Sequence, residues 1–132
     1  CVCLMDLFAT LAELLDVPLP AGAGEDSVSF FHALMEAGHS VRPIATAADR
    51  RTLVHHSGRG RFALRRGDWK LVDAADSGAL GLKEWRVPVP GEPAGMLFCM
   101  ADDVCEARNL WEQEPELVDE LLSELIAEQD GT

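Results

Sequence analysis

The sequence predicts an α+β fold in which a small four-stranded antiparallel sheet is packed by a C-terminal amphipathic helix, with two N-terminal helices before the sheet. Two observations lead to this prediction. Short apolar runs, alternating with polar residues in the middle ones, predict strands at 52–56, 61–66, 69–74 and 96–100. Apolar residues at helical spacing predict helices over 4–15, over about 29–37 and from 115 onward.

The first predicted helix has apolar residues on successive turns, and its first turn holds Asp6, a position where a carboxylate suits the free N–H groups. Pro18 and Pro20 end it, because proline cannot continue a helix. Ser27 or Ser29 is expected to cap the second helix. Gly38 is expected to end that second helix.

The sheet is predicted from a hairpin and two flanking runs. Gly67-Asp68 separates two alternating segments, which is typical of a tight turn between antiparallel strands. Residues 75–94 are rich in glycine and proline and predict a long loop, and Asp102-Asp103 is expected to open a turn.

The last helix is the clearest predicted element. Pro115 stands at its start, where a missing N–H costs nothing. One apolar stripe follows, formed by Leu117, Val118, Leu121, Leu122, Leu125 and Ile126. The acidic residues Glu116, Asp119, Glu120 and Glu124 are interpreted as a solvated helix face and not as a metal site.

The three tryptophans are expected to pack in different places. Trp69 is predicted to lie between the sheet and the last helix, and Trp111 at the entry of that helix. Trp85 falls in the long loop, where an apolar anchor is favoured over a sugar-stacking role.

The domain organisation follows from these elements. Residues 1–38 form a helical segment, 39–51 a linker, and 52–132 a sheet-and-helix domain. The first two helices carry bulky apolar side chains, including Phe8, that something must cover. The candidates are the second face of the sheet, a second copy of the chain, or a larger domain.

Composition excludes several classes of function. The chain has 132 residues, 48% hydrophobic and 26% charged, as expected for one globular domain. Its net charge of −12 argues against nucleic acid and anionic membranes as partners. There is no apolar run long enough for a transmembrane helix, and Cys1–Asp6 lacks the pattern of a signal peptide. We therefore expect a soluble protein, while the compartment stays open.

Cysteine spacing gives little support for a metal or redox centre. The four cysteines stand at 1, 3, 99 and 105, as C-x-C and C-x5-C pairs, and zinc sites usually show C-x2-C or C-x4-C pairs. We expect no bound metal, and we expect Cys3 and Cys99 to be buried, inert thiols.

Four strings of this sequence, in order, resemble the C-terminal portion of the sulfatase family, and of arylsulfatase-like enzymes in particular. The strings are Met5–Pro20, the hairpin 61–72 led by Leu53–Ser57, the segment Leu97–Leu110, and the helix that follows Glu114-Pro115-Glu116. The third string is similar to the family pattern Leu-Tyr-Asp-Leu-x-x-Asp-Pro-x-Glu-x-x-Asn-Leu. Its departures from that pattern include Phe98, Cys99 and Val104.

The resemblance implies sulfuric ester hydrolysis, with a nucleophile that this chain does not carry. Intact sulfatases oxidise the first residue of Cys-x-Pro-x-Arg, or Ser-x-Pro-x-Arg, to formylglycine beside a calcium ion held by Asp and Asn ligands. None of the four cysteines here has proline two positions later. We expect no catalytic residue, calcium or formylglycine in this chain, and no sulfatase activity of the chain alone.

The candidate substrate-side residues are His55, His56 and Arg65. Adjacent strand residues face opposite ways, so one histidine is expected to point to a cleft and the other to the core or solvent. The resemblance implies that this strand end lies near the substrate pocket. A pair of exposed or internally satisfied histidines is nevertheless the favoured interpretation, because a His without a partner cluster is a weak signal.

A basic cluster surrounds the hairpin, formed by Arg59, Arg61, Arg65, Arg66 and Lys70. Guanidinium groups of this kind can bind sulfate or carboxylate. The favoured interpretation is ordinary exposed strand charge on an acidic protein.

The sequence therefore predicts a C-terminal fragment of a sulfatase-like sulfuric ester hydrolase. Its expected partner is either a missing N-terminal catalytic domain or a second copy of itself. The alternative is a stand-alone homodimeric interaction module derived from a sulfatase, in which the N-terminal helices dock on a partner or on another copy. A cysteine-based metal or redox protein is a distant third interpretation.

Overall fold

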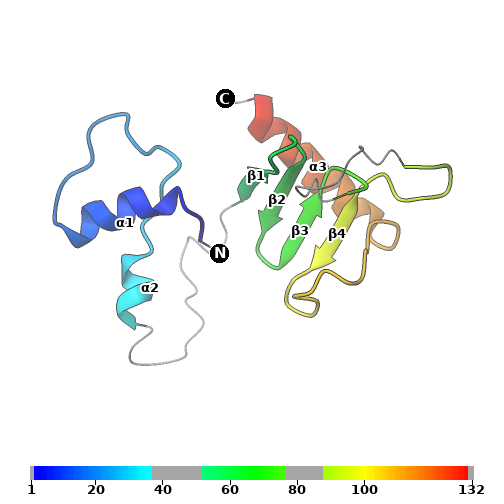
Figure 1. Ribbon diagram of the computed structural model, residues 1–132, viewed down its shortest axis with the longest axis horizontal. Coiled ribbons are helices and arrows are strands. Elements are labelled where there is room, and N and C mark those ends of the chain that lie inside the picture. The colour runs from blue at the N-terminus through cyan, green and yellow to red at the C-terminus, as the bar shows by residue number, and fades with distance from the viewer. Residues whose placement is uncertain (1, 37–51, 77–87, 131–132) are drawn as a thin grey trace. The chain divides into compact units, whose positions relative to one another are not determined.

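The structure is a computed structural model that describes residues 2–36, 52–76 and 88–130 (Figure 1). The chain forms two compact units, Cys1–Arg50 and Arg51–Thr132, and each is described by itself. The predicted linker 39–51, Gly38 and Trp85 lie outside the described residues.

The second unit contains the predicted four-stranded antiparallel sheet. Its strands are β1 (Leu53–His56), β2 (Phe62–Arg66), β3 (Trp69–Val72) and β4 (Met96–Cys99), in that spatial order. Each strand is slightly shorter than its predicted range, because strand pairing stops where the turns begin. Helix α3 (Pro115–Asp130) lies across one face of the sheet and packs on β2 and β3 (Figure 1).

The core lies between this sheet face and α3. Strand register aligns Val54, Leu64, Leu71 and Leu97 in one row across the four strands. The last three are fully buried and pack against the buried α3 residues Val118, Leu121 and Leu125. Alternation along the strands therefore selects the apolar face that the helix covers.

Both tryptophans of the described part of this unit pack against the core, as predicted for Trp69 and Trp111. The prediction for Ile126 was wrong, since its side chain is 54% exposed. Leu121 and Leu125, four residues apart, point at the sheet, and Ile126 is turned about 100° away from Leu125 around the helix.

The hairpin turn and one asparagine fix the geometry of the sheet. Gly67 and Asp68 form the predicted two-residue turn between the paired residues Arg66 and Trp69, and Gly67 has a φ of 56°, which glycine adopts without strain. Asn109 Oδ1 accepts the N–H groups of Leu97 and Trp111, each at 3.0 Å. This asparagine therefore anchors the segment before α3 to β4.

The first unit is built around α1 (Asp6–Leu14) and α2 (Phe31–Glu36). Both predicted helices are present, each with shorter bounds than predicted. Ser29 Oγ accepts the Phe31 N–H at 3.2 Å, in line with the expected cap of the second helix. No helix in the described parts of the chain has the length and apolar character needed to cross a membrane.

A set of hydrogen bonds, here named the polar clip, holds the segment 27–30 against α1. Asp6 Oδ1 accepts the Val28 N–H at 3.1 Å, and Asp6 Oδ2 accepts the Cys3 N–H at 2.9 Å. Thr10 Oγ1 donates to the Asp6 carbonyl and accepts the Phe30 N–H. Ser27 Oγ donates to the Met5 carbonyl and accepts the Ala9 N–H. Asp6 lies in the first helical turn, as predicted from the sequence, and its carboxylate also binds the segment 27–30.

Candidate functional site

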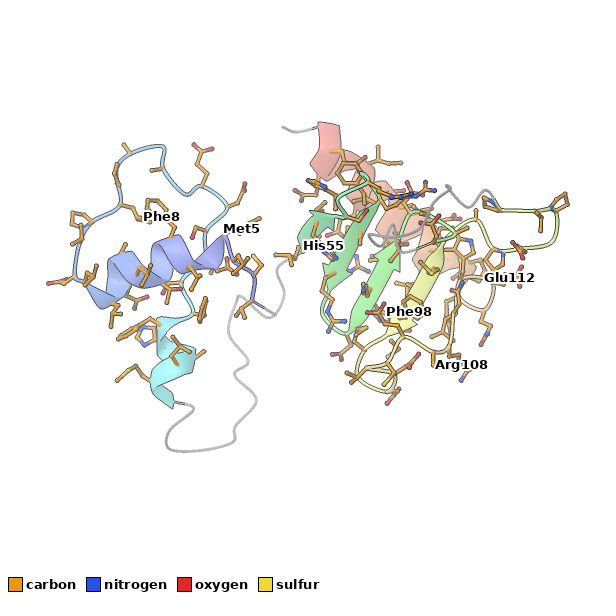
Figure 2. All side chains as sticks on the ribbon, in the orientation of Figure 1. Met5, Phe8, His55, Phe98, Arg108 and Glu112 are labelled. Atoms are coloured by element: carbon orange, nitrogen blue, oxygen red, sulfur yellow. The ribbon has the colours of Figure 1, made fainter. Side chains whose placement is uncertain are left out.

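The face of the sheet opposite α3 carries the candidate residues His55 and Arg65. On this face Arg65 is the direct cross-strand partner of Lys70, and His55 is the partner of Ala63. His55 is labelled in Figure 2, on β1. The same face has a small apolar cluster of Ala63, Val72 and Ala74, with Met96 packed against it. The sheet therefore places one imidazole and two cationic side chains on a common surface.

The two cations on this face are already engaged in contacts. Lys70 Nζ donates to Glu106 Oε1 at 2.5 Å, in an ion pair that is largely shielded from solvent. Arg65 Nη1 donates to the Asp68 carbonyl at 3.3 Å, which braces the hairpin turn. The local positive charge on this face is thus partly balanced by the protein itself.

His55 is the titratable group whose environment on this face is most perturbed. Partial burial lowers its pKa below 6.5, the nearby positive charge of Lys70 lowers it further, and Glu106 opposes both. A neutral imidazole at neutral pH can accept or donate a hydrogen bond but carries no charge with which to attract an anion.

His56 points the other way, as strand alternation predicts. Its ring lies 5.7 Å from the ring of Phe62, its cross-strand partner, and its Nδ1 is 2.9 Å from the Ser57 carbonyl oxygen. The histidines therefore do not converge on one site.

Arg61 and Arg66 bind carboxylates of the chain, so the interpretation of these two residues as exposed strand charge was wrong. Arg61 Nη2 lies 3.3 Å from Asp76 Oδ2, with both side chains mostly buried. Arg66 Nη1 contacts Glu120 at 2.8 Å and Glu124 at 2.9 Å, which ties β2 to α3. Two acidic residues four positions apart on one helix face were the signal in the sequence for this contact.

The cysteines are more accessible than predicted. Cys3 and Cys99 are half-buried and not buried, because Cys3 precedes α1 and Cys99 ends β4. Cys3 Sγ contacts Asp6 Oδ2 at 3.3 Å, and Cys99 Sγ lies 3.8 Å from Asp102 Oδ2. Cys99 and Cys105 are free thiols.

The acidic pair Asp102-Asp103 forms a turn after β4, as predicted. Asp103 accepts the N–H groups of Ala107 at 3.0 Å and Arg108 at 2.8 Å, and these bonds lower the pKa of its carboxyl. Within the residues that the structure describes, no three His, Cys, Asp or Glu side chains are grouped so that they could hold a metal ion.

Comparison with known proteins identifies what this architecture is similar to. An N-acetylgalactosamine-6-O-sulfatase of Bacteroides thetaiotaomicron is 29% identical over 123 residues, which are 92% of this chain and 22% of the relative. A solved sulfatase structure, from a study of the metabolism of multiple glycosaminoglycans by the same organism, matches 96% of this chain with 28% identity and a TM-score of 0.64. The chain resembles the C-terminal portion of a sulfatase.

The share of each relative that the match covers is as informative as the percentage of identical residues. The chain spans about a fifth of the curated relative and 24% of the solved sulfatase chain. The structure of Ps i-CgsB matches 96% of this chain at 19% identity and a TM-score of 0.51, which supports the fold alone. No family model matches the chain.

Proposed function

We propose that this chain is the C-terminal portion of a sulfatase-like sulfuric ester hydrolase and supplies its small sheet-and-helix domain. The observation that carries the proposal is the similarity to a carbohydrate sulfatase along 92% of this chain. The order of elements supports it, because the two helices, the antiparallel sheet and the last helix follow one another as the resemblance implied.

On this proposal the chemistry belongs to polypeptide outside these residues. The 132 residues contain neither Cys-x-Pro-x-Arg nor Ser-x-Pro-x-Arg, so they provide no precursor of a formylglycine nucleophile. The described residues offer no cluster that fits calcium. The chain alone is therefore proposed to be inactive on sulfate esters.

The proposed contribution of this domain is to contact the substrate. His55 and Arg65 lie on the open sheet face and are the side chains proposed to reach a sulfated sugar. His56 lies on the opposite face and would act separately. A 6-O-sulfated N-acetylgalactosamine is the first substrate to test, because the curated relative is named for that activity.

An activity assay of two proteins tests the proposal. The first is the purified chain with calcium, given an aryl sulfate and 6-O-sulfated N-acetylgalactosamine, for which we expect no turnover. The second is the Bacteroides sulfatase with its matched segment replaced by this chain, for which we expect calcium-dependent turnover. Robust turnover by the chain alone would contradict the proposal, as would a folded, calcium-binding chimaera without activity.

A stand-alone homodimeric interaction module is the second candidate function. The observation that favours it is the exposure of the large apolar side chains of α1 and α2, namely Leu7, Phe8, Leu11, Leu14, Leu34 and Met35. Light scattering after size exclusion at micromolar concentration tests it. A stable dimer favours the module, and a monomer opposes it.

A further inference from the structure

The sheet has two edge strands, β1 and β4, and the register shows which backbone groups of β1 point outward (Figure 1). In an antiparallel ladder every second residue bonds to the neighbouring strand, and the residues between them direct their N–H and C=O groups away from it. The Ser57 N–H donates to the Arg61 carbonyl of the neighbouring chain segment at 2.9 Å. The alternate residues Val54 and His56 therefore present their N–H and C=O groups at the outer edge of β1.

The outer edge of β4 is covered by the segment that follows it. Its outward residues are Leu97 and Cys99. The Leu97 N–H donates to Asn109 Oδ1 at 3.0 Å, and the Leu97 carbonyl accepts the Leu110 N–H at 2.8 Å. The Cys99 carbonyl accepts two N–H groups of the turn after β4, at 3.2 and 2.9 Å. Local groups therefore close this edge to another strand.

The outer edge of β1 has no such cover within the described parts of the chain. There, the outward N–H and C=O groups of Val54 and His56 have no hydrogen-bond partner. The strand Leu53–His56 also contains no Lys, Pro or Gly, the residues that usually keep a free edge from pairing. Thr52 Oγ1 bonds to Glu124 of α3, and β2 pairs with the other side of the strand. β1 is therefore a preformed edge that can accept a further strand.

The surroundings of β1 indicate what such a strand presents. Val54 is partly buried and packs against the core under α3, so a residue paired beside it on that face would meet apolar atoms. Arg59, in the loop after β1, is half-buried and contacts no carboxylate among the described residues. A complementary strand therefore has an apolar residue beside Val54 and an acidic residue near Arg59.

The small size of this edge favours a strand from the same polypeptide over a second copy. Val54 and His56 offer two N–H and two C=O groups for pairing. Between two separate chains, each with a net charge of −12, these bonds would have to offset the lost translational freedom and the repulsion of like charges. A tethered segment avoids most of that cost, because its effective concentration is high. The length of the relatives allows for such a segment, since this chain spans 22% of the curated relative and 24% of the solved sulfatase chain.

We propose that β1 accepts a fifth strand, formed by an extended segment of the catalytic portion of the sulfatase. Backbone hydrogen bonds to Val54 and His56 would supply the pairing, and the apolar contact beside Val54 would fix the register. In identifying the partner as the catalytic portion, the inference rests on the proposed function.

Hydrogen exchange of the Val54 and His56 amides tests the fifth strand. It is measured by mass spectrometry with residue-level fragmentation in the purified chain and in the chimaera proposed above. We expect fast exchange at both amides in the chain alone, and exchange at least about tenfold slower in the chimaera. The Leu64 amide, inside the sheet, should be protected in both proteins and reports that the sheet is folded.

Three variants of the chimaera test whether the protection comes from backbone pairing. Val54→Pro removes an outward N–H at a position where an edge strand tolerates proline, and should accelerate exchange at His56 by about tenfold. Val54→Ala shortens the same side chain but keeps the N–H, and should leave His56 protected. Cys99→Pro removes an outward N–H from the other edge and should also leave His56 protected. Protection of Leu64 in each variant shows that the sheet remains folded.

The contrary outcomes identify what covers β1 instead. Equal, fast exchange at His56 in both proteins would overturn the proposal. Protection in the chain alone would also overturn it, and would indicate a second copy if it rises with concentration or another segment of this chain if it does not. Protection in the chimaera that survives Val54→Pro would mean burial without strand pairing, and the proposal would again be wrong.

None of these measurements detects hydrolysis. An active chimaera with fast exchange at His56 would refute the fifth strand and leave the sulfatase proposal standing. A folded, calcium-binding but inactive chimaera with a protected His56 would refute the hydrolase proposal and leave the fifth strand standing.

Discussion

The two units differ in whether their large apolar side chains are buried or exposed. In the second unit the leucines of β2, β3 and β4 are fully buried under α3, and charged residues lie outside. In the first unit an aspartate and a threonine of α1 are buried, while the large apolar residues of that helix are exposed. The second unit therefore carries its own core, whereas the described part of the first leaves its large apolar side chains exposed.

This difference has an energetic meaning. Burying one leucine stabilises a fold by about 1.5–3 kcal/mol, whereas one hydrogen bond contributes about 0.5–1.5 kcal/mol net. The second unit is stabilised mainly by buried leucines, and the first unit mainly by hydrogen bonds. We expect the second unit to resist unfolding by itself, and the first to become stable when the exposed apolar side chains of α1 and α2 are covered.

The largest expected effect compares a leucine from each unit. Leu71→Ala removes a fully buried side chain from the sheet core and should cost about 2–5 kcal/mol. Leu14→Ala removes a side chain that is 55% exposed and should change stability by less than about 0.5 kcal/mol. Urea unfolding followed by tryptophan fluorescence measures the first, and hydrogen exchange of α1 amides measures the second. A large loss for Leu14→Ala would mean that α1 is packed inside the molecule.

The next effect concerns the polar clip. Asp6 accepts the Val28 N–H with one carboxylate oxygen and the Cys3 N–H with the other. Asp6→Asn replaces one of these carboxylate oxygens with an NH2 group, so that one hydrogen-bond donor faces a backbone N–H donor. This change should reduce the stability of the first unit by about 1–3 kcal/mol. Asp16→Asn is the matched control, because Asp16 is exposed and Asn tolerates its positive φ of 52°. Hydrogen exchange at Val28 should accelerate for Asp6→Asn only.

The sequence predicted the second unit better than the first, and the reason is physical. Alternation and helical spacing are local signals, so the four strands, the Gly67-Asp68 turn and α3 could be placed from them. Ile126 was misplaced because spacing gives a wide stripe, and the width of the sheet face decides which residues it covers.

The first unit depends on contacts between residues far apart in sequence. Asp6 bonds to Val28, 22 positions away, and no periodicity signals that pairing. The helix over 4–15 was predicted, but which of its sides faces inward was not, since the apolar side is the natural choice. Of the candidate site, alternation predicted that His55 and His56 diverge, while the pairing of Lys70 with Glu106 required the folded loop after β4.

A smaller effect concerns the ion pairs between β2 and α3. Arg66→Met keeps the aliphatic stem and removes the charge that binds Glu120 and Glu124, so the loss should be about 1 kcal/mol. Glu124 is 28% exposed and Glu120 is 62% exposed, so a double-mutant cycle should show stronger coupling of Arg66 to Glu124. If the two coupling energies are equal, or if neither of them weakens when salt is added, these contacts add nothing to the packing of α3.

The smallest effect is the pH dependence that His55 gives to the second unit. Burial and Lys70 hold its pKa below the unfolded value of 6.5, so the unfolded chain binds the proton first as the pH falls. Above pH 6.5 His55 is neutral in both states and costs nothing. Stability should decline as the pH drops from 6.5 through the folded pKa and stay constant below it, and His55→Gln should remove this slope.

Substitutions of two residues near His55 test the sign of each charge's contribution to its pKa. The pKa is measured by following the His55 imidazole resonances as the pH changes. Lys70→Met removes a positive charge and should raise the pKa of His55, whereas Glu106→Gln removes a negative charge and should lower it. His56 is the other titratable neighbour and lies on the opposite face of the sheet. Its substitution should therefore shift the titration midpoint of His55 least. A higher pKa of His55 in Lys70→Met, together with a lower one in Glu106→Gln, would show that the charged groups on this sheet face are electrostatically coupled. A His55 midpoint at 6.5 that neither substitution changes would show that His55 is a solvent-exposed imidazole without electrostatic coupling to Lys70 or Glu106.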